Sequence, residues 1–158
     1  MNKSIYTLAF SLTLSSFFAQ TLPDAVKKSE NELFDSAELD FKSLISKQPT
    51  QGDNYFYLGD NFFRSGLLDK QSDFIDSAEF YFKKGIEVNA TNGLNYVGMG
   101  KVFLYKNNLN DAKAQFFKAS SISQNKNAEV ARQTSEAWLT TETKSADDAI
   151  TAANLAVK

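Results

Sequence analysis

The 158-residue sequence contains no cysteine and no histidine, and these absences exclude several kinds of site. Without cysteine there is no disulfide and no thiol nucleophile, and without histidine there is no catalytic imidazole. Zinc sites of the usual type need the same two residues, so a metal would have to bind through carboxylates and carbonyl oxygens alone. No phosphate-binding glycine motif is present either, so the sequence predicts neither a metal centre nor a cofactor.

An excess of positive charge is also lacking. The chain has 17 basic and 19 acidic residues, a net charge of −2, so we expect no nucleic-acid partner. Hydrophobic residues make up 42% of the chain and aromatic residues 13%, which is not the composition of a disordered chain. The length fits one domain or one short array of repeats.

The first 20 residues have the order of a secretory signal peptide. Lys3 is their only charge, residues 5–14 are mostly apolar, and small or polar residues lead to Ala19. The apolar stretch is shorter than the roughly 20 residues of a membrane span. We therefore expect cleavage beside Ala19 or Gln20, no stable membrane span afterwards, and export to the periplasm or cell envelope of a Gram-negative bacterium. A retained N-terminal anchor helix is the alternative.

The remaining chain repeats itself. Segments 34–41 and 75–82 both read apolar-Asp-Ser-Ala-Glu-x-x-Phe, and weaker copies follow at 109–116 and 146–153. The alanines of successive copies lie 41, 34 and 37 residues apart. These are Ala37, Ala78, Ala112 and Ala149, followed four residues later by Phe41, Phe82, Phe116 and Ala153. Because residues four and seven apart share a helical face, each copy predicts a helix that packs through a small residue beside a large one.

A second apolar stripe precedes the two middle copies. It reads aromatic, Leu or Met, Gly and aromatic, as Tyr55, Leu58, Gly59 and Phe62, and again as Tyr96, Met99, Gly100 and Phe103. Glycine inside a helix costs about 1 kcal/mol relative to alanine, so it needs a packing reason. Two glycines in register predict that helix backbones approach closely at Gly59 and Gly100.

These motifs resemble the tetratricopeptide repeat, Trp-x-x-Leu-Gly-x-x-Tyr followed by Ala-x-x-x-Phe over 34 residues. The resemblance covers residues 21–158 and is strongest in the two middle units. It implies an all-α fold, an α-solenoid of about four helical hairpins wound into a right-handed superhelix. The units are about 22–47, 51–88, 92–124 and 127–157. The alternative is an ordinary helical bundle with coincidental spacing.

Two irregularities accompany the repeats. The 41-residue spacing exceeds 34 by seven, and the surplus lies near residues 67–75. It predicts either a second helix two turns longer, with Leu68 and Ile75 on one face, or a seven-residue loop bulge. The last unit also lacks a polar capping helix, so either the chain is a fragment or its end face docks on something.

In this family the first helix of each hairpin lines the concave wall. Residues of those helices that avoid the packing stripe should then point into a groove. The resemblance places Phe56, Tyr57, Asp60, Arg64, Lys101, Tyr105 and Trp138 there. Such a mixture suits a peptide or protein segment, and Arg64 would hold a carboxylate in a two-pronged contact. The alternative for several of the aromatics is that they pack against the neighbouring hairpin.

We therefore expect a non-catalytic protein–protein interaction scaffold that binds a peptide or protein segment in its concave groove within the bacterial envelope. No motif supplies the lysine or carboxylate base that a serine nucleophile would need, so we do not expect an enzyme. The alternative is an N-terminal architectural repeat segment of a larger envelope protein whose activity lies in a missing C-terminal part.

Overall fold

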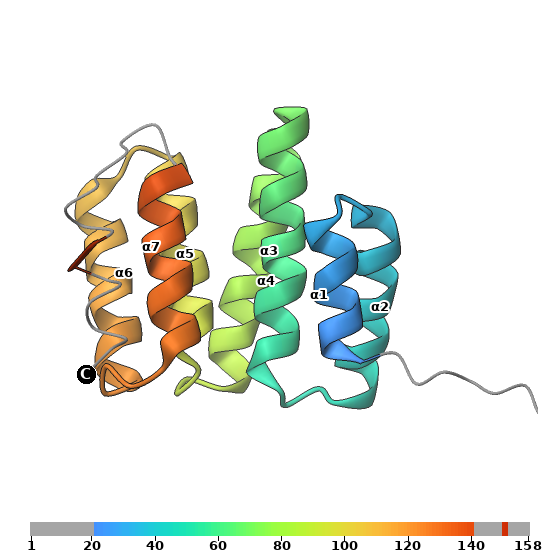
Figure 1. Ribbon diagram of the computed structural model, residues 1–158, viewed down its shortest axis with the longest axis horizontal. Helices are drawn as coiled ribbons and strands as arrows, with labels where there is room; N and C mark the ends of the chain where they lie inside the picture. The colour runs from blue at the N-terminus through green and yellow to red at the C-terminus, as the bar shows by residue number, and fades with distance from the viewer. Residues whose placement is uncertain (1–20, 141–149, 152–158) are drawn as a thin grey trace, which may run out of the picture.

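A computed structural model describes residues 21–140 and 150–151, and this part of the chain is helical with no strand (Figure 1). Thr21 and Asn127 illustrate why the helices begin where they do, since each side-chain oxygen accepts hydrogen bonds from backbone N–H groups of the first turn. None of the described helices is both long and apolar enough to cross a membrane. The helices are α1 (Leu22–Glu30), α2 (Phe34–Lys47), α3 (Gly52–Asp69), α4 (Ser72–Val88), α5 (Gly93–Tyr105), α6 (Leu109–Ile122) and α7 (Ala128–Thr140).

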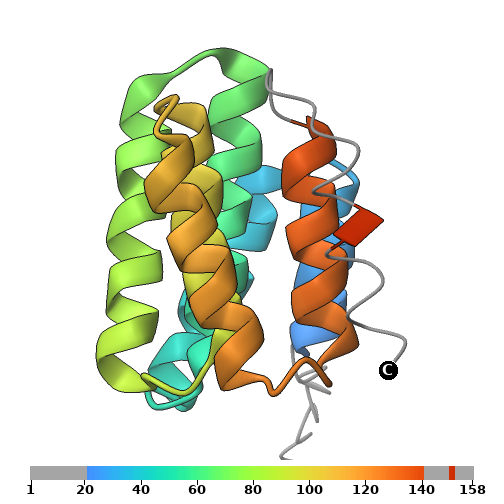
Figure 2. The same ribbon diagram turned by 90° about the vertical axis from the view of Figure 1, so that its left-hand side faces the viewer.

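Consecutive helices form hairpins that stack side by side. The most extensive contacts join α3 to α4 and α5 to α6, and α3 also packs against α2 and α5. Figure 2 shows α4 and α6 along one side of the molecule and α7 along the other. The first helices of the hairpins therefore share one face and the second helices the opposite face, as the repeat pattern predicts.

The small residues of the repeats lie where the two helices of a hairpin pack against each other. Ala78 and Ala112 are fully buried, and a β-carbon added at Gly59 would lie 2.6 Å from Cε1 of Phe82. A β-carbon at Gly100 would likewise collide with the Phe116 ring. The predicted packing register is therefore confirmed, but an aromatic ring of the paired helix, and not its backbone as predicted, lies against each glycine.

The prediction for the seven-residue surplus is wrong in both of its forms. Instead of one helix gaining two turns or a loop bulging out, both arms of the hairpin lengthen. α3 has 18 residues against 13 in α5, and α4 has 17 against 14 in α6. Leu68 is 58% exposed near the end of α3, whereas Ile75 is buried in α4, so the two do not share a helical face.

The lengthened hairpin of α3 and α4 has a short turn at its tip. α3 ends at Asp69 and α4 begins at Ser72, with Lys70 in the left-handed region at a φ of 54°. In Figure 1 the upper end of α3 rises above the connection between α1 and α2. Dividing the extra residues between the two arms keeps the packing phase of both helices and extends only the exposed tip.

The two ends of the chain are less completely described. α7 is the first helix of the unit predicted at 127–157. The second helix of that unit lies outside the described residues, apart from Ile150 and Thr151, which are helical and exposed. The predicted signal peptide, residues 1–20, also lies outside them.

Candidate binding groove

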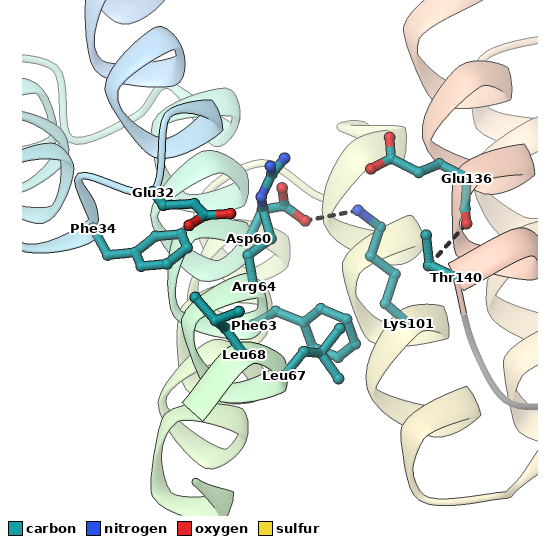
Figure 3. A pocket seen from close by; sticks show the side chains of 10 residues that line it. All are labelled: Glu32, Phe34, Asp60, Phe63, Arg64, Leu67, Leu68, Lys101, Glu136 and Thr140. Atoms are coloured by element: carbon teal, nitrogen blue, oxygen red, sulfur yellow. Dashed lines mark hydrogen bonds and ion pairs between the residues drawn. The ribbon is translucent and has the colours of Figure 1, made fainter. Parts of the chain in front are cut away.

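A cavity of about 360 Å³ opens on the face formed by the first helices, between the α1–α2 connection, α3, α5 and α7 (Figure 3). The residues that form its wall belong to first helices of hairpins, apart from Glu32 in the α1–α2 connection and Phe34 at the start of α2. The cavity therefore lies on the side where the resemblance predicts a groove. It is lined by Glu32, Phe34, Asp60, Phe63, Arg64, Leu67, Leu68, Lys101, Glu136 and Thr140.

A buried ion pair crosses the floor of the groove. The Lys101 Nζ donates to Asp60 Oδ1 at 2.7 Å and to Gln133 Oε1 at 2.6 Å, so one ammonium group links α5 to both α3 and α7. Both charged side chains are nearly inaccessible. The same ammonium lies 5.7 Å from the centre of the Phe56 ring. With these partners, the Lys101 charge is satisfied within the protein.

A second polar network joins α3 to α7. The Tyr57 hydroxyl donates to Glu129 Oε1 at 3.2 Å, and this hydrogen bond connects α3 directly to α7. Arg132 holds Glu129 through two hydrogen bonds of 2.7 and 2.9 Å and reaches Glu136 at 3.0 Å. Gln133 also donates to Glu129 and so connects this network to the Lys101 pair.

The ionisation of these groups follows from their surroundings. Burial raises the pKa of the Tyr57 phenol well above its ordinary value, and the neighbouring Glu129 charge adds to the effect. Burial also acts to raise the pKa of Glu129, but hydrogen bonds from Arg132 and Gln133 outweigh it and hold that pKa below its ordinary value. The hydrogen bond to Glu129 raises the pKa of Arg132. At neutral pH Glu129 and Arg132 are therefore both charged, and their ion pair is maintained.

Arg64 differs from the other charged residues of the groove. It is half-buried on α3, one turn after Asp60, and it lines the cavity. Figure 3 shows Asp60 joined to Lys101 and not to Arg64. Among the described residues no ion pair or side-chain hydrogen bond engages Arg64 or Glu32, whereas Glu136 is paired with Arg132. The groove thus holds one guanidinium whose donors are available to a ligand.

Two of the residues predicted for the groove lie in the core instead. Phe56 is 0% exposed and packs against Phe82 with ring centres 5.9 Å apart. Trp138 is 4% exposed and packs against Phe116 at 5.3 Å. The physical reason is that packed helices leave gaps both within and between hairpins, and large aromatic side chains fill them. The alternative interpretation, packing against the neighbouring hairpin, is correct for Trp138, whereas Phe56 packs against Phe82 of its own hairpin.

Of the other predicted residues, some line the cavity and some do not. Asp60, Arg64 and Lys101 line the cavity, although Asp60 and Lys101 are used for the internal ion pair. Tyr57 is half-buried and belongs to the polar network. Tyr105 is 43% exposed, rests edge-on against Phe63 and does not line the cavity.

Several lining residues were not predicted. Leu67 and Leu68 reach the groove because the lengthened α3 continues past Gly66, and the surplus in repeat spacing was the only signal for them. Glu136 follows Arg132 by four residues, a spacing that favours an ion pair on one helix. Glu32 lies in the connection between α1 and α2 and has a φ of 61°. The repeat motif does not predict this conformation.

The stacked hairpins and their glycine contacts define an all-α solenoid of tetratricopeptide-like hairpins. Comparison with solved structures agrees. The tetratricopeptide repeat protein TTC0263 of Thermus thermophilus superposes with a TM-score of 0.66 at 17% identity, over 85% of this chain and 69% of that one. The structure of MamA superposes with a TM-score of 0.53 at 18% identity, over 86% of this chain and 74% of that one. No protein-family model and no curated protein sequence matches the chain.

Proposed function

We propose that the protein is a non-catalytic scaffold that binds a peptide segment of a partner protein in the concave groove. The observation that carries the proposal is Arg64, whose guanidinium lines the cavity without an ion-pair partner among the described residues. A half-buried guanidinium is left without a counter-charge at some cost in free energy, and a carboxylate would satisfy it through two parallel hydrogen bonds.

The neighbouring side chains specify the rest of the ligand. Leu67 and Leu68 follow Arg64 on α3 and present exposed apolar surface to the same cavity. Glu32, across the opening, is the other charged group of the lining without an ion pair among the described residues. A segment that places a carboxylate on Arg64 and an apolar side chain on the two leucines fits this arrangement.

The charged groups of the groove support binding better than catalysis. Asp60 is held by Lys101 and Glu136 by Arg132, so these two carboxylates are fixed in ion pairs instead of being placed to take up a proton. The resemblance in fold to a tetratricopeptide repeat protein is consistent with a scaffold that presents a preformed groove, which limits the ordering cost of binding.

The test is selection of binders from a displayed library of random peptides, followed by affinity measurement. We expect enriched peptides to carry an acidic residue near apolar ones. Arg64→Gln should weaken the selected peptide about 10- to 100-fold, since a hydrogen bond to a charged group contributes about 1.5–3 kcal/mol. Lys118→Gln on the exposed side of α6 is the matched control and should change nothing. Equal affinity of wild type and Arg64→Gln, with helicity intact, would reject the groove.

The cellular location is part of the proposal. The basic start and short apolar stretch of residues 1–20 support export to the envelope of a Gram-negative bacterium. Fractionation of the native cells, with N-terminal sequencing of the purified protein, tests this. A mature chain that begins at Gln20 or Thr21 in the envelope fraction is expected, and an intact Met1 in the cytoplasm would contradict it.

A further inference from the structure

The lengthened hairpin creates a second cleft beside the concave groove, and the two share Glu32, Phe34 and Leu68. It lies between the tip of α3 and α4 and the connection between α1 and α2, and has a volume of about 550 Å³. We call it the tip cleft. Its lining comprises Glu32, Leu33, Phe34, Asp35, Ser36, Ser65, Leu68, Asp69, Gln71 and Phe74.

The tip cleft is apolar at its centre. Leu33 is 56% exposed and Leu68 is 58% exposed, and half-buried Phe34 and Phe74 lie beside them. Exposed leucines that gather around one hollow differ from singly scattered ones, because they offer continuous apolar surface to a partner. The extra turns of α3 and α4 bring Leu68 and Phe74 to this place, so the cleft depends on the surplus residues of unit two.

The rim of the tip cleft carries charge of one sign. Its charged lining residues are Glu32, Asp35 and Asp69, with no lysine or arginine among them. Within the described part of the chain, no ion pair engages any of the three, and the Asp69 carboxylate only accepts a 3.4 Å hydrogen bond from Ser65. Three carboxylates around an apolar centre favour a ligand with apolar side chains flanked by positive ones.

We propose that the tip cleft docks a basic amphipathic segment of a partner protein, with an apolar residue between Leu33 and Leu68 and lysine or arginine side chains toward Glu32, Asp35 and Asp69. The site is independent of the proposed function, because the concave groove selects a carboxylate through Arg64. The two clefts share Glu32, Phe34 and Leu68, but Arg64 lines only the groove, whereas Leu33, Asp35 and Asp69 line only the tip cleft.

The experiment uses a synthetic peptide of about 15 residues, the length at which an isolated helix becomes possible. Leucines are placed at helical spacing on one face and lysines on the other. Binding of the labelled peptide to the full chain is followed by fluorescence anisotropy. We expect saturable binding that weakens as salt is raised, and at least tenfold weaker binding of the same peptide with glutamate in place of lysine.

Variants then locate the site. Leu33→Ser should lower the affinity about tenfold, as expected for loss of one apolar contact. It should not unfold α2, because Leu33 occupies the N-cap position, where serine is favoured. Leu39→Ser removes a leucine that is also exposed, on α2 away from the cleft, and should leave binding unchanged. Asp69→Asn should reduce both the affinity and its dependence on salt.

Several results would overturn the proposal. Equal binding of the lysine and glutamate peptides would remove the role of the acidic rim, and equal losses from Leu33→Ser and Leu39→Ser would indicate non-specific adsorption. Sedimentation that shows a dimer abolished by Leu33→Ser would assign the cleft to a second copy of the chain. Arg64→Gln should not change lysine-peptide binding, and Leu33→Ser should not change binding of the acidic peptides, so failure at one cleft is distinguishable from failure at the other.

Discussion

Replacing Gly98 with alanine tests how the second and third hairpins interlock. Phe82 on α4 is fully buried, and a β-carbon at either Gly59 of α3 or Gly98 of α5 would lie closer to its ring than carbon atoms normally pack. Because the ring is closed in from both sides, it cannot move away from a new methyl group. Alanine gains about 1 kcal/mol of helix propensity over glycine, but overpacking a core costs about 1–3 kcal/mol. We therefore expect Gly98→Ala to reduce the free energy of unfolding by about 1 kcal/mol.

The sign of this effect should reverse when the ring is removed. In a Phe82→Leu background the space beside Gly98 opens, so Gly98→Ala should stabilise the protein by up to about 1 kcal/mol through propensity alone. The resulting coupling energy is on the order of 2 kcal/mol, within the range for residues in contact. Ser46→Ala, at an exposed position of α2, is the control and should have the same small effect in both backgrounds.

Urea unfolding followed by the helical circular dichroism signal measures these differences. A Gly98→Ala protein that is more stable than wild type, or one whose change is the same with phenylalanine and leucine at position 82, would refute the interlock.

Three further predictions concern the groove and the core. Lys101→Met should lower the free energy of unfolding by about 3–5 kcal/mol, because it leaves Asp60 buried and uncompensated, and Lys101→Met combined with Asp60→Leu should recover most of the loss in urea titrations. If the single variant proves as stable as the double variant, the pair is not buried in solution. The lowered pKa of Glu129 means that its contribution to stability is complete above the ordinary value of 4.5 and is lost as the pH falls through the lower, folded-state value. The free energy of unfolding measured from pH 6 to pH 3 should therefore fall less steeply in Glu129→Gln than in wild type, and parallel curves would contradict this. Trp138, the single tryptophan, should emit at shorter wavelength in the native protein than in urea and resist quenching by acrylamide, and ready quenching would place it at the surface.

The sequence was sufficient to predict the helices and their packing register. Small residues recur at fixed spacing beside phenylalanines, and only close helix contact explains glycine at Gly59 and Gly100. The same reasoning did not identify Gly98, because it falls outside the repeat motif. Its role depends on Phe82 of the preceding hairpin, a contact that no local spacing reveals.

The groove was less predictable than the fold. Helical position predicts which residues leave the packing stripe, but it does not separate the concave surface from the gaps within and between hairpins. Phe56 and Trp138 therefore lie in the core, although Arg64 lines the cavity. The pairing of Lys101 with Asp60 depends on the distance between α3 and α5, which the sequence does not encode in any local pattern.

Hydrogen exchange of the full chain with and without a selected acidic peptide tests the binding account most directly. We predict slower exchange in the second half of α3 and in α7, whose residues form the walls around Arg64, with no change in α2, α4 and α6. Slower exchange confined to those three outer helices would contradict the concave groove as the binding site.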